Sequence, residues 1–166
     1  MKKSRIKKFA VILVLALLVV AVYLFFSRPI TIQQRFPMLS PEKCTGMEGY
    51  YRDEAGKALQ KFTVHKNSEE FAVLWELLYE QAYHREFRDL LPKGTRVHAA
   101  QPGDFEWEVF FLFDKVELSD GNTGSGGILR IQYWYGELEV YFEDNSLSCH
   151  VKDQETWAMQ VLDIIR

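Results

Sequence analysis

An unbroken apolar stretch from Phe9 to Phe26 constrains this chain more than any other feature. It contains 18 residues without a charged side chain, and as a helix it would extend about 27 Å at roughly 1.5 Å per residue. The hydrocarbon core of a bilayer is about 30 Å thick. The long side chains of Lys7, Lys8 and Arg28 at its two ends can reach the headgroups. The stretch therefore predicts a transmembrane helix over residues 9–26.

The residues that close this stretch bear on whether it is a retained anchor or a cleaved export signal. A cleavable signal has an apolar core of about 7 to 15 residues, followed by small residues at the cleavage site. The segment Phe25–Pro29 offers no pair of small residues at that spacing. A retained anchor is the favoured interpretation, and a cleaved signal is the alternative.

Basic residues are distributed unequally around the apolar stretch. Five of them precede it, namely Lys2, Lys3, Arg5, Lys7 and Lys8. Only Arg28 and Arg35 lie in the first 15 residues after it. Because cytoplasmic flanks carry the excess of Lys and Arg, residues 1–8 are predicted to be a basic cytoplasmic tail and residues 27–166 an extracytoplasmic domain. The chain would then be a single-pass protein of the cell membrane.

The part of the chain after the anchor is acidic. Without the five N-terminal cations, 15 basic side chains remain against 23 acidic ones, a formal charge of −8. Such a surface repels nucleic acid and anionic lipid headgroups. We therefore expect no nucleic-acid partner. The expected partners are the bilayer, through residues 9–26, and a protein of the cell envelope.

Residues 128–143, with the sequence ILRIQYWYGELEVYFE, predict a β-hairpin. If Tyr135-Gly136 forms a two-residue turn, apolar residues pair across the strands on one face. These pairs are Tyr133 with Leu138, Ile131 with Val140, and Leu129 with Phe142. The opposite face then carries Arg130, Gln132, Trp134, Glu137, Glu139 and Tyr141. On that face we expect Arg130 to reach Glu139 diagonally.

Other strands are predicted from alternating or continuous apolar runs. Residues 105–113 predict a strand whose far end is covered on both faces. Residues 49–65 predict two strands around a loop containing Asp53 and Gly56. Weaker patterns predict extended segments at Ile30–Phe36 and Arg96–Ala99.

Two helices are predicted among these strands. The first is capped by Asn67 or Ser68 and continues through Leu91. Its apolar stripe is Phe71, Leu74, Trp75, Leu78 and Ala82. The second begins near Asp153 and presents Trp157, Ala158, Val161, Leu162 and Ile165. The predicted fold class is α+β: an N-terminal transmembrane helix followed by one compact domain, with an antiparallel sheet and two helices packed on one face.

The two cysteines, Cys44 and Cys149, both lie after the anchor. Outside the cytoplasm two such thiols commonly form a disulfide. A bridge that closes a loop of about a hundred residues would stabilise the fold by about 4 to 5 kcal/mol in the chain-entropy model. We therefore expect a disulfide between Cys44 and Cys149.

An alternative makes Cys149 a nucleophile. An anchored outer domain with Cys149 late in NSLSCH and His98 earlier in the chain resembles a sortase, a cell-wall transpeptidase that uses Cys, His and Arg. The resemblance implies that Cys149 attacks the substrate. The chain departs from the sortase pattern at three points: the Thr-Leu-x-Thr-Cys spacing is one residue short, no Gly precedes His98, and Arg166 is the only arginine after Cys149.

The remaining titratable residues form no complete catalytic or metal-binding pattern. Glu106 with Glu108, and Glu137 with Glu139, share a face within each strand, where we expect a solvated acidic ladder. The histidines are scattered, at His65, His84, His98 and His150. No pair has the spacing that places two imidazoles on one helical face. The sequence predicts no cofactor and no metal site.

The sequence does not identify a biochemical activity. A convincing anchor joined to a fold without a complete catalytic constellation favours a membrane-anchored, non-enzymatic binding or interaction module of the cell envelope. The alternative is an envelope enzyme, either a hydrolase or a Cys-dependent transpeptidase that uses Cys149.

Overall fold

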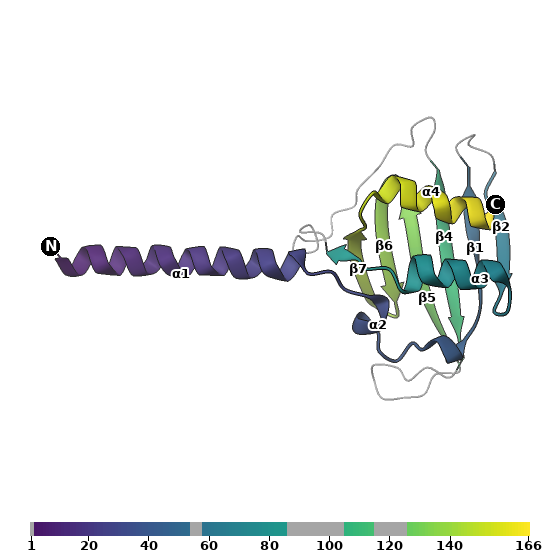
Figure 1. Ribbon diagram of the computed structural model, residues 1–166, viewed down its shortest axis with the longest axis horizontal. Coiled ribbons are helices and arrows are strands. Elements are labelled where there is room, and N and C mark those ends of the chain that lie inside the picture. The colour runs from purple at the N-terminus through teal and green to yellow at the C-terminus, as the bar shows by residue number, and fades with distance from the viewer. Residues whose placement is uncertain (1, 54–57, 86–104, 115–125) are drawn as a thin grey trace.

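A computed structural model describes residues 2–53, 58–85, 105–114 and 126–166. It contains a long N-terminal helix, a seven-stranded antiparallel sheet and shorter helices (Figure 1). The predicted α+β class and the antiparallel sheet are confirmed.

The helices are α1 (Lys2–Ser27), α2 (Ile32–Arg35), the 3₁₀ turn η1 (Pro41–Lys43), α3 (Glu69–Leu74), the π-helical turn η2 (Trp75–Tyr79) and α4 (Gln154–Ile165). The strands are β1 (Cys44–Arg52), β2 (Gln60–His65), β3 (His84–Arg85), β4 (Glu106–Phe113), β5 (Gly127–Trp134), β6 (Glu137–Phe142) and β7 (Asn145–His150). Their order across the sheet is β2-β1-β4-β5-β6-β7-β3.

Helix α1 carries the predicted membrane-spanning segment. Its apolar part, Ala10–Ser27, is long enough to cross a bilayer and is not buried by the rest of the described structure, although Arg85 contacts Phe25 near its C-terminal end. An unburied apolar helix of this length is compatible with a single-pass anchor or with a signal sequence.

The predicted hairpin is present as β5 and β6, with the expected register. Tyr133 pairs with Leu138, Ile131 with Val140 and Leu129 with Phe142. The turn residues Tyr135 and Gly136 have φ angles of 52° and 74°, as a type I′ turn requires at both central positions. The expected contact between Arg130 and Glu139 is wrong. The Arg130 guanidinium instead lies 3.2 Å from Glu108 Oε1 and over the ring of Tyr141.

Helices α3 and α4 lie on the same face of the sheet and cross its strands (Figure 1). Buried indole groups tie both helical segments to the core. Trp107 Nε1 on β4 donates to the carbonyl oxygen of Ala158 on α4, at 2.9 Å. Trp157 Nε1 donates to the carbonyl oxygen of Leu77, at 3.1 Å. The core therefore lies between the sheet and these two helices.

The first helix of this layer starts as predicted but ends early. The Ser68 hydroxyl caps it by accepting the Phe71 N–H, and the stripe from Phe71 to Leu78 is buried. The predicted continuation through Leu91 is wrong, because the helical segment ends at Tyr79 and His84–Arg85 forms β3 beside β7. Ala82 is accordingly exposed.

Two extended segments were predicted before and after this region. The one at Ile30–Phe36 is wrong beyond its first residue: Ile30 forms an isolated bridge with Tyr83, and Thr31 then caps α2 through a capping box with Gln34. The segment Arg96–Ala99 lies outside the described residues. Strand β4 also differs from expectation, because its residues alternate between buried and half-buried along its whole length.

Candidate functional site: the uncovered sheet face

The predicted disulfide is absent from the structure, in which Cys44 and Cys149 are both free and buried. Cys44 lies on β1 and Cys149 on β7, with β4, β5 and β6 between them. At about 4.8 Å per strand, four strand intervals separate them by roughly 19 Å. A disulfide needs α-carbons within about 7 Å, so this sheet order keeps the two thiols apart.

The residues of the proposed Cys-dependent enzyme are not brought together by the described part of the chain. Cys149 is fully buried, with its Sγ 3.7 Å from the carbonyl oxygen of Leu138. Arg166 lies at the other side of the sheet, where its carbonyl oxygen accepts the Tyr51 hydroxyl of β1. His98 lies outside the described residues. A nucleophilic thiolate needs access as well as a nearby cation. Arg85 pairs with Cys149 across β3 and β7, but the thiol is fully buried, so the access is missing.

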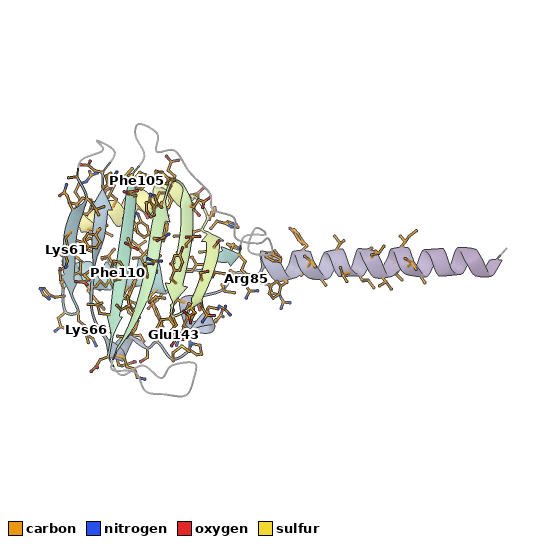
Figure 2. All side chains as sticks on the ribbon, turned by 180° about the vertical axis from the view of Figure 1, so that it is seen from behind. Lys61, Lys66, Arg85, Phe105, Phe110 and Glu143 are labelled. Atoms are coloured by element: carbon orange, nitrogen blue, oxygen red, sulfur yellow. The ribbon has the colours of Figure 1, made fainter. Side chains whose placement is uncertain are left out.

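The face of the sheet opposite α3 and α4, here called the uncovered face, is covered by no helix of the described ranges (Figure 2). Half-buried side chains of β1, β4, β5 and β6 point to this side. Among the described residues after α1, the large apolar side chains that remain exposed are Tyr50, Leu59, Val73, Ile128 and Trp134. All except Val73, which lies on α3, belong to this face or to the hollow in it.

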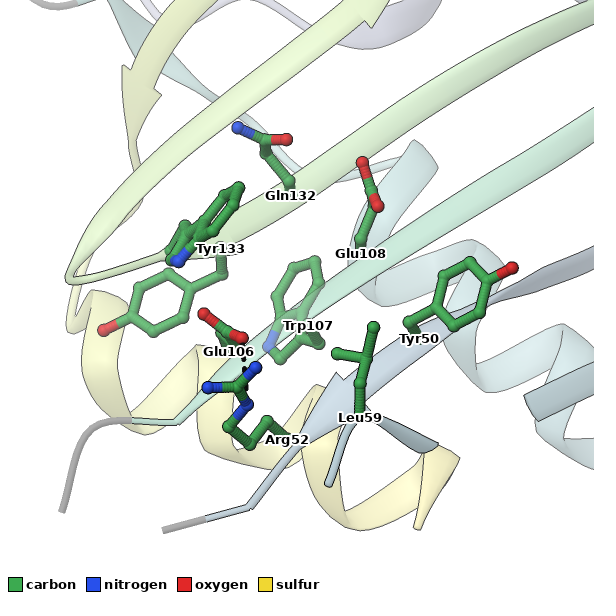
Figure 3. A pocket seen from close by; sticks show the side chains of 9 residues that line it. Tyr50, Arg52, Leu59, Glu106, Trp107, Glu108, Gln132 and Tyr133 are labelled. Atoms are coloured by element: carbon green, nitrogen blue, oxygen red, sulfur yellow. Dashed lines mark ion pairs between the residues drawn. The ribbon is translucent and has the colours of Figure 1, made fainter. Parts of the chain in front are cut away.

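A hollow of about 190 Å³ lies on the uncovered face (Figure 3). Its lining residues are Tyr50, Arg52, Leu59, Glu106, Trp107, Glu108, Gln132, Tyr133 and Trp134. Pockets for drug-sized ligands usually measure about 300 to 1,000 Å³. The hollow therefore has room for one ring-sized group rather than for a nucleotide-sized cofactor.

Strand pairing brings the polar residues of the hollow together. Tyr50 pairs with Glu108 and Arg52 with Glu106 across β1 and β4. Arg52 Nε lies 3.2 Å from Glu106 Oε1, but this buried nitrogen lacks hydrogen-bond geometry, so the contact is an ion pair only. Glu108 is paired with Arg130 in turn. The predicted solvated ladder is therefore wrong for Glu106 and Glu108, whose charges are compensated within the face.

A hydrogen-bonded cluster on β5, β6 and β7 continues the polar surface beside the hollow. The Glu139 carboxylate accepts from Gln132 Nε2 at 2.9 Å and from the Tyr141 hydroxyl. Burial, together with the hydrogen bond to Glu139, holds the pKa of Tyr141 well above its usual value. Gln132 Nε2 also donates to the Tyr141 hydroxyl, at 3.4 Å, so the side chain of Gln132 is held at the edge of the hollow by these hydrogen bonds.

Along the described strands that line the hollow, a ligand would be recognised through side chains. Strands β1, β4 and β5 each have a neighbour on both sides, so their backbone N–H and C=O groups are used in the ladder. The available groups are two aromatic faces, Tyr50 and Trp134, and the polar side chains of Glu106, Glu108 and Gln132. This combination suits stacking and hydrogen bonding.

The sequence predicted the position of some residues of this surface but assigned none of them to a binding site. It placed Gln132 and Trp134 on one face of the hairpin. It did not identify Tyr50, Arg52 or Leu59 as site residues. The alternation of β1 shows that Tyr50 and Arg52 share a face, but nothing in the local pattern shows that β4 lies beside them.

No protein-family model, curated protein or solved structure matches this chain.

Proposed function

We propose that this protein is a single-pass membrane protein whose residues 27–166 form an extracytoplasmic binding module of the cell envelope. Helix α1 supports the anchor, and the basic residues of 1–8 support a cytoplasmic N-terminus. The uncovered face is the ligand-binding surface.

One observation carries this proposal: exposed Tyr50, Leu59 and Trp134 gather around a hollow in the sheet. Trp134 is 47% exposed and Leu59 is 52% exposed. An exposed apolar cluster rimmed by polar residues is typical of an interaction site. Val73, the exposed apolar residue on the other side of the sheet, is isolated on α3 and needs no such explanation.

The charges of the face indicate an uncharged ligand. Among the described residues of this face, Arg52, Arg130 and Lys61 are each paired with a glutamate, so none of these three cations is left to select an anion. The domain's formal charge of −8 repels polyanions. A neutral saccharide unit fits these conditions, because its flat C–H face can stack on Trp134 or Tyr50 while its hydroxyl groups bond to carboxylate and amide side chains. We therefore assign a neutral glycan chain as the ligand.

Calorimetric titration of the full chain in nanodiscs tests this assignment, with cellohexaose, chitohexaose and maltohexaose as probes. At least one should bind, and Trp134→Ala should weaken binding about tenfold, since a stacked ring contributes about 1 to 1.5 kcal/mol. Val73→Ala, which removes an exposed apolar side chain from the other side of the sheet, is the matched control. Equal affinity of the two variants, or no binding of any probe, would refute the saccharide assignment.

A second measurement distinguishes a glycan from a protein ligand. A photoreactive amino acid placed at position 134 should crosslink to glycan in intact cells, and one at position 73 should not. A specific protein captured from position 134 but not from position 73 would replace the glycan by an envelope protein.

The proposed membrane anchor and its orientation have their own test. Protease added to intact cells should digest the part of the chain after α1, and alkaline carbonate should leave the protein in the membrane. Protection from protease would contradict the proposed orientation.

A further inference from the structure

The connection between α1 and the sheet is very short. Helix α1 ends at Ser27, and Ile30 already exchanges two backbone hydrogen bonds with Tyr83, each 2.8 Å long. Only Arg28 and Pro29 lie between them. Because a fully extended residue spans at most about 3.6 Å, Ile30 lies within roughly 11 Å of the end of the helix. A sheet joined in this way cannot move far from whatever holds α1.

A side-chain contact fixes the same edge of the sheet against α1. Arg85 of β3 places its guanidinium carbon 4.2 Å from the ring centroid of Phe25. Phe25 belongs to the apolar segment Ala10–Ser27, near its end, where a spanning helix enters the headgroup layer. Figure 2 shows Arg85 beside the end of α1 and Lys61 at the opposite side of the sheet. The Arg85 guanidinium would therefore lie at the depth of the lipid phosphates.

The order of the strands places the contact between Arg85 and Phe25 at one edge of the sheet. Strand β3 is one edge of the sheet and β2 is the other. Six strand intervals of about 4.8 Å separate them, roughly 29 Å in all. In Figure 1, α1 extends away from the β3 edge. The β3 edge therefore faces the bilayer while the β2 edge is remote from it.

We propose that the β3 edge is a membrane-contact site at which Arg28 and Arg85 bind phosphate groups of the lipid headgroups. A guanidinium can donate two parallel hydrogen bonds to one phosphate. The guanidinium carbon of Arg85 lies over the Phe25 ring. The N–H groups of a guanidinium lie at its edge, so a group that stacks on a ring can still donate hydrogen bonds to a phosphate. The acidic charge of the domain as a whole does not prevent this contact. Zwitterionic lipids carry phosphate groups as anionic lipids do, so the two arginines can bind phosphate at a membrane without net charge. This inference rests on the retention of α1 in the bilayer, which is part of the proposed function.

The test uses the full chain in phosphatidylcholine vesicles that contain a lipid with a nickel-chelating headgroup. A spin label is attached to His150→Cys on β7, next to the β3 edge, or to Lys61→Cys on β2. Both positions are exposed, whereas the two natural cysteines are buried. We expect strong collisional relaxation by nickel at position 150 and little at position 61. Equal relaxation at the two positions would overturn the proposed orientation of the sheet.

Arginine variants test the phosphate chemistry. Loss of the two guanidinium groups removes the hydrogen bonds to phosphate that would hold the β3 edge against the headgroups. Arg28→Ala with Arg85→Ala should therefore lower relaxation at position 150. Arg166→Ala, at the other side of the sheet, is the matched control and should not. Vesicles of digalactosyldiacylglycerol, which has no phosphate, should give wild-type protein the reduced relaxation of the double variant.

The outcomes separate this inference from the proposed function. Unchanged relaxation in the double variant, or full relaxation in the galactolipid, would overturn the phosphate site while leaving the anchor intact. Alkaline carbonate extraction of the same samples reports on the anchor alone. Release of the protein by carbonate would refute the retained anchor and, with it, the membrane contact.

Discussion

Trp107 and Ala158 join the sheet to the C-terminal helix through a hydrogen bond of 2.9 Å from the indole nitrogen to the carbonyl oxygen. Both residues are almost completely buried. The bond lies between β4, a central strand, and α4, and it fixes the depth at which α4 packs.

Trp107→Phe should lower the free energy of unfolding by about 2 to 3 kcal/mol, because it removes this hydrogen bond and leaves a cavity. Denaturant unfolding of the full chain in detergent, followed by circular dichroism of the sheet, measures the change. Trp134→Phe removes the same atoms from an exposed site and should stay within about 0.5 kcal/mol of wild type. Similar losses in the two variants would contradict the packing of Trp107.

The two thiols should react only after unfolding. Both are buried, and burial raises the pKa of the Cys44 thiol, which lowers its reactive thiolate fraction. Maleimide labelling followed by mass spectrometry should find no modification of the native chain and two modifications in denaturant. A change of intact mass on reduction would instead reveal a disulfide that this sheet order does not allow.

Ionisation of the Tyr79 hydroxyl should lower the free energy of unfolding at high pH. Burial raises the pKa of Tyr79 to about 12, against about 10 in an unfolded chain. Between pH 10 and 12 the unfolded chain loses this proton first, so the free energy of unfolding decreases as pH rises.

Tyr79→Phe should flatten that decrease, because it removes the ionising group, although it also removes the hydrogen bond that Tyr79 donates to the carbonyl oxygen of Leu39. Burial also raises the pKa of Tyr83, so part of the slope should remain. Urea unfolding midpoints at pH 8, 10 and 11 provide the measurement. The same slope in wild type and variant would rule out Tyr79 as a contributor.

The two positions of the β5–β6 turn should respond in opposite directions. Both have positive φ angles, a conformation that Gly and Asn adopt more easily than other residues. Gly136→Ala should lower stability by about 1 kcal/mol, although no atom lies within 4 Å of the added methyl position. Tyr135→Asn should raise it by a few tenths. Thermal unfolding of the full chain compares them, and a shift in the same direction for both would contradict a type I′ turn.

The elements that the sequence predicts well are those specified by neighbouring residues. Alternation on both sides of Tyr135-Gly136 defines the register of the β5–β6 hairpin, because a slip of one residue would expose every apolar side chain. The Ser68 cap and the α4 stripe are equally local. Helix α3 was predicted too long because its apolar stripe does not show that Tyr83 pairs with Ile30.

Long-range pairing could not be predicted in the same way. Tyr50 and Glu108 lie on strands that are far apart in the sequence, and no local pattern selects β4 as the neighbour of β1. The expected disulfide failed for the same reason: the number of cysteines carries no information on the order of β1 and β7. The hollow depends on that order, so its residues became visible only in the folded chain.

The two-residue connection between Ser27 and Ile30 also limits where a ligand can be met. If α1 is retained in the bilayer, as proposed, a domain joined to it without a stalk cannot extend far from the membrane to meet a ligand. Strand β4, at the centre of the hollow, is four strand intervals from β3, so it would be held roughly 19 Å above the headgroups. Encounters would then depend on lateral diffusion in the membrane plane, with the aromatic surface facing sideways into the layer next to the lipid.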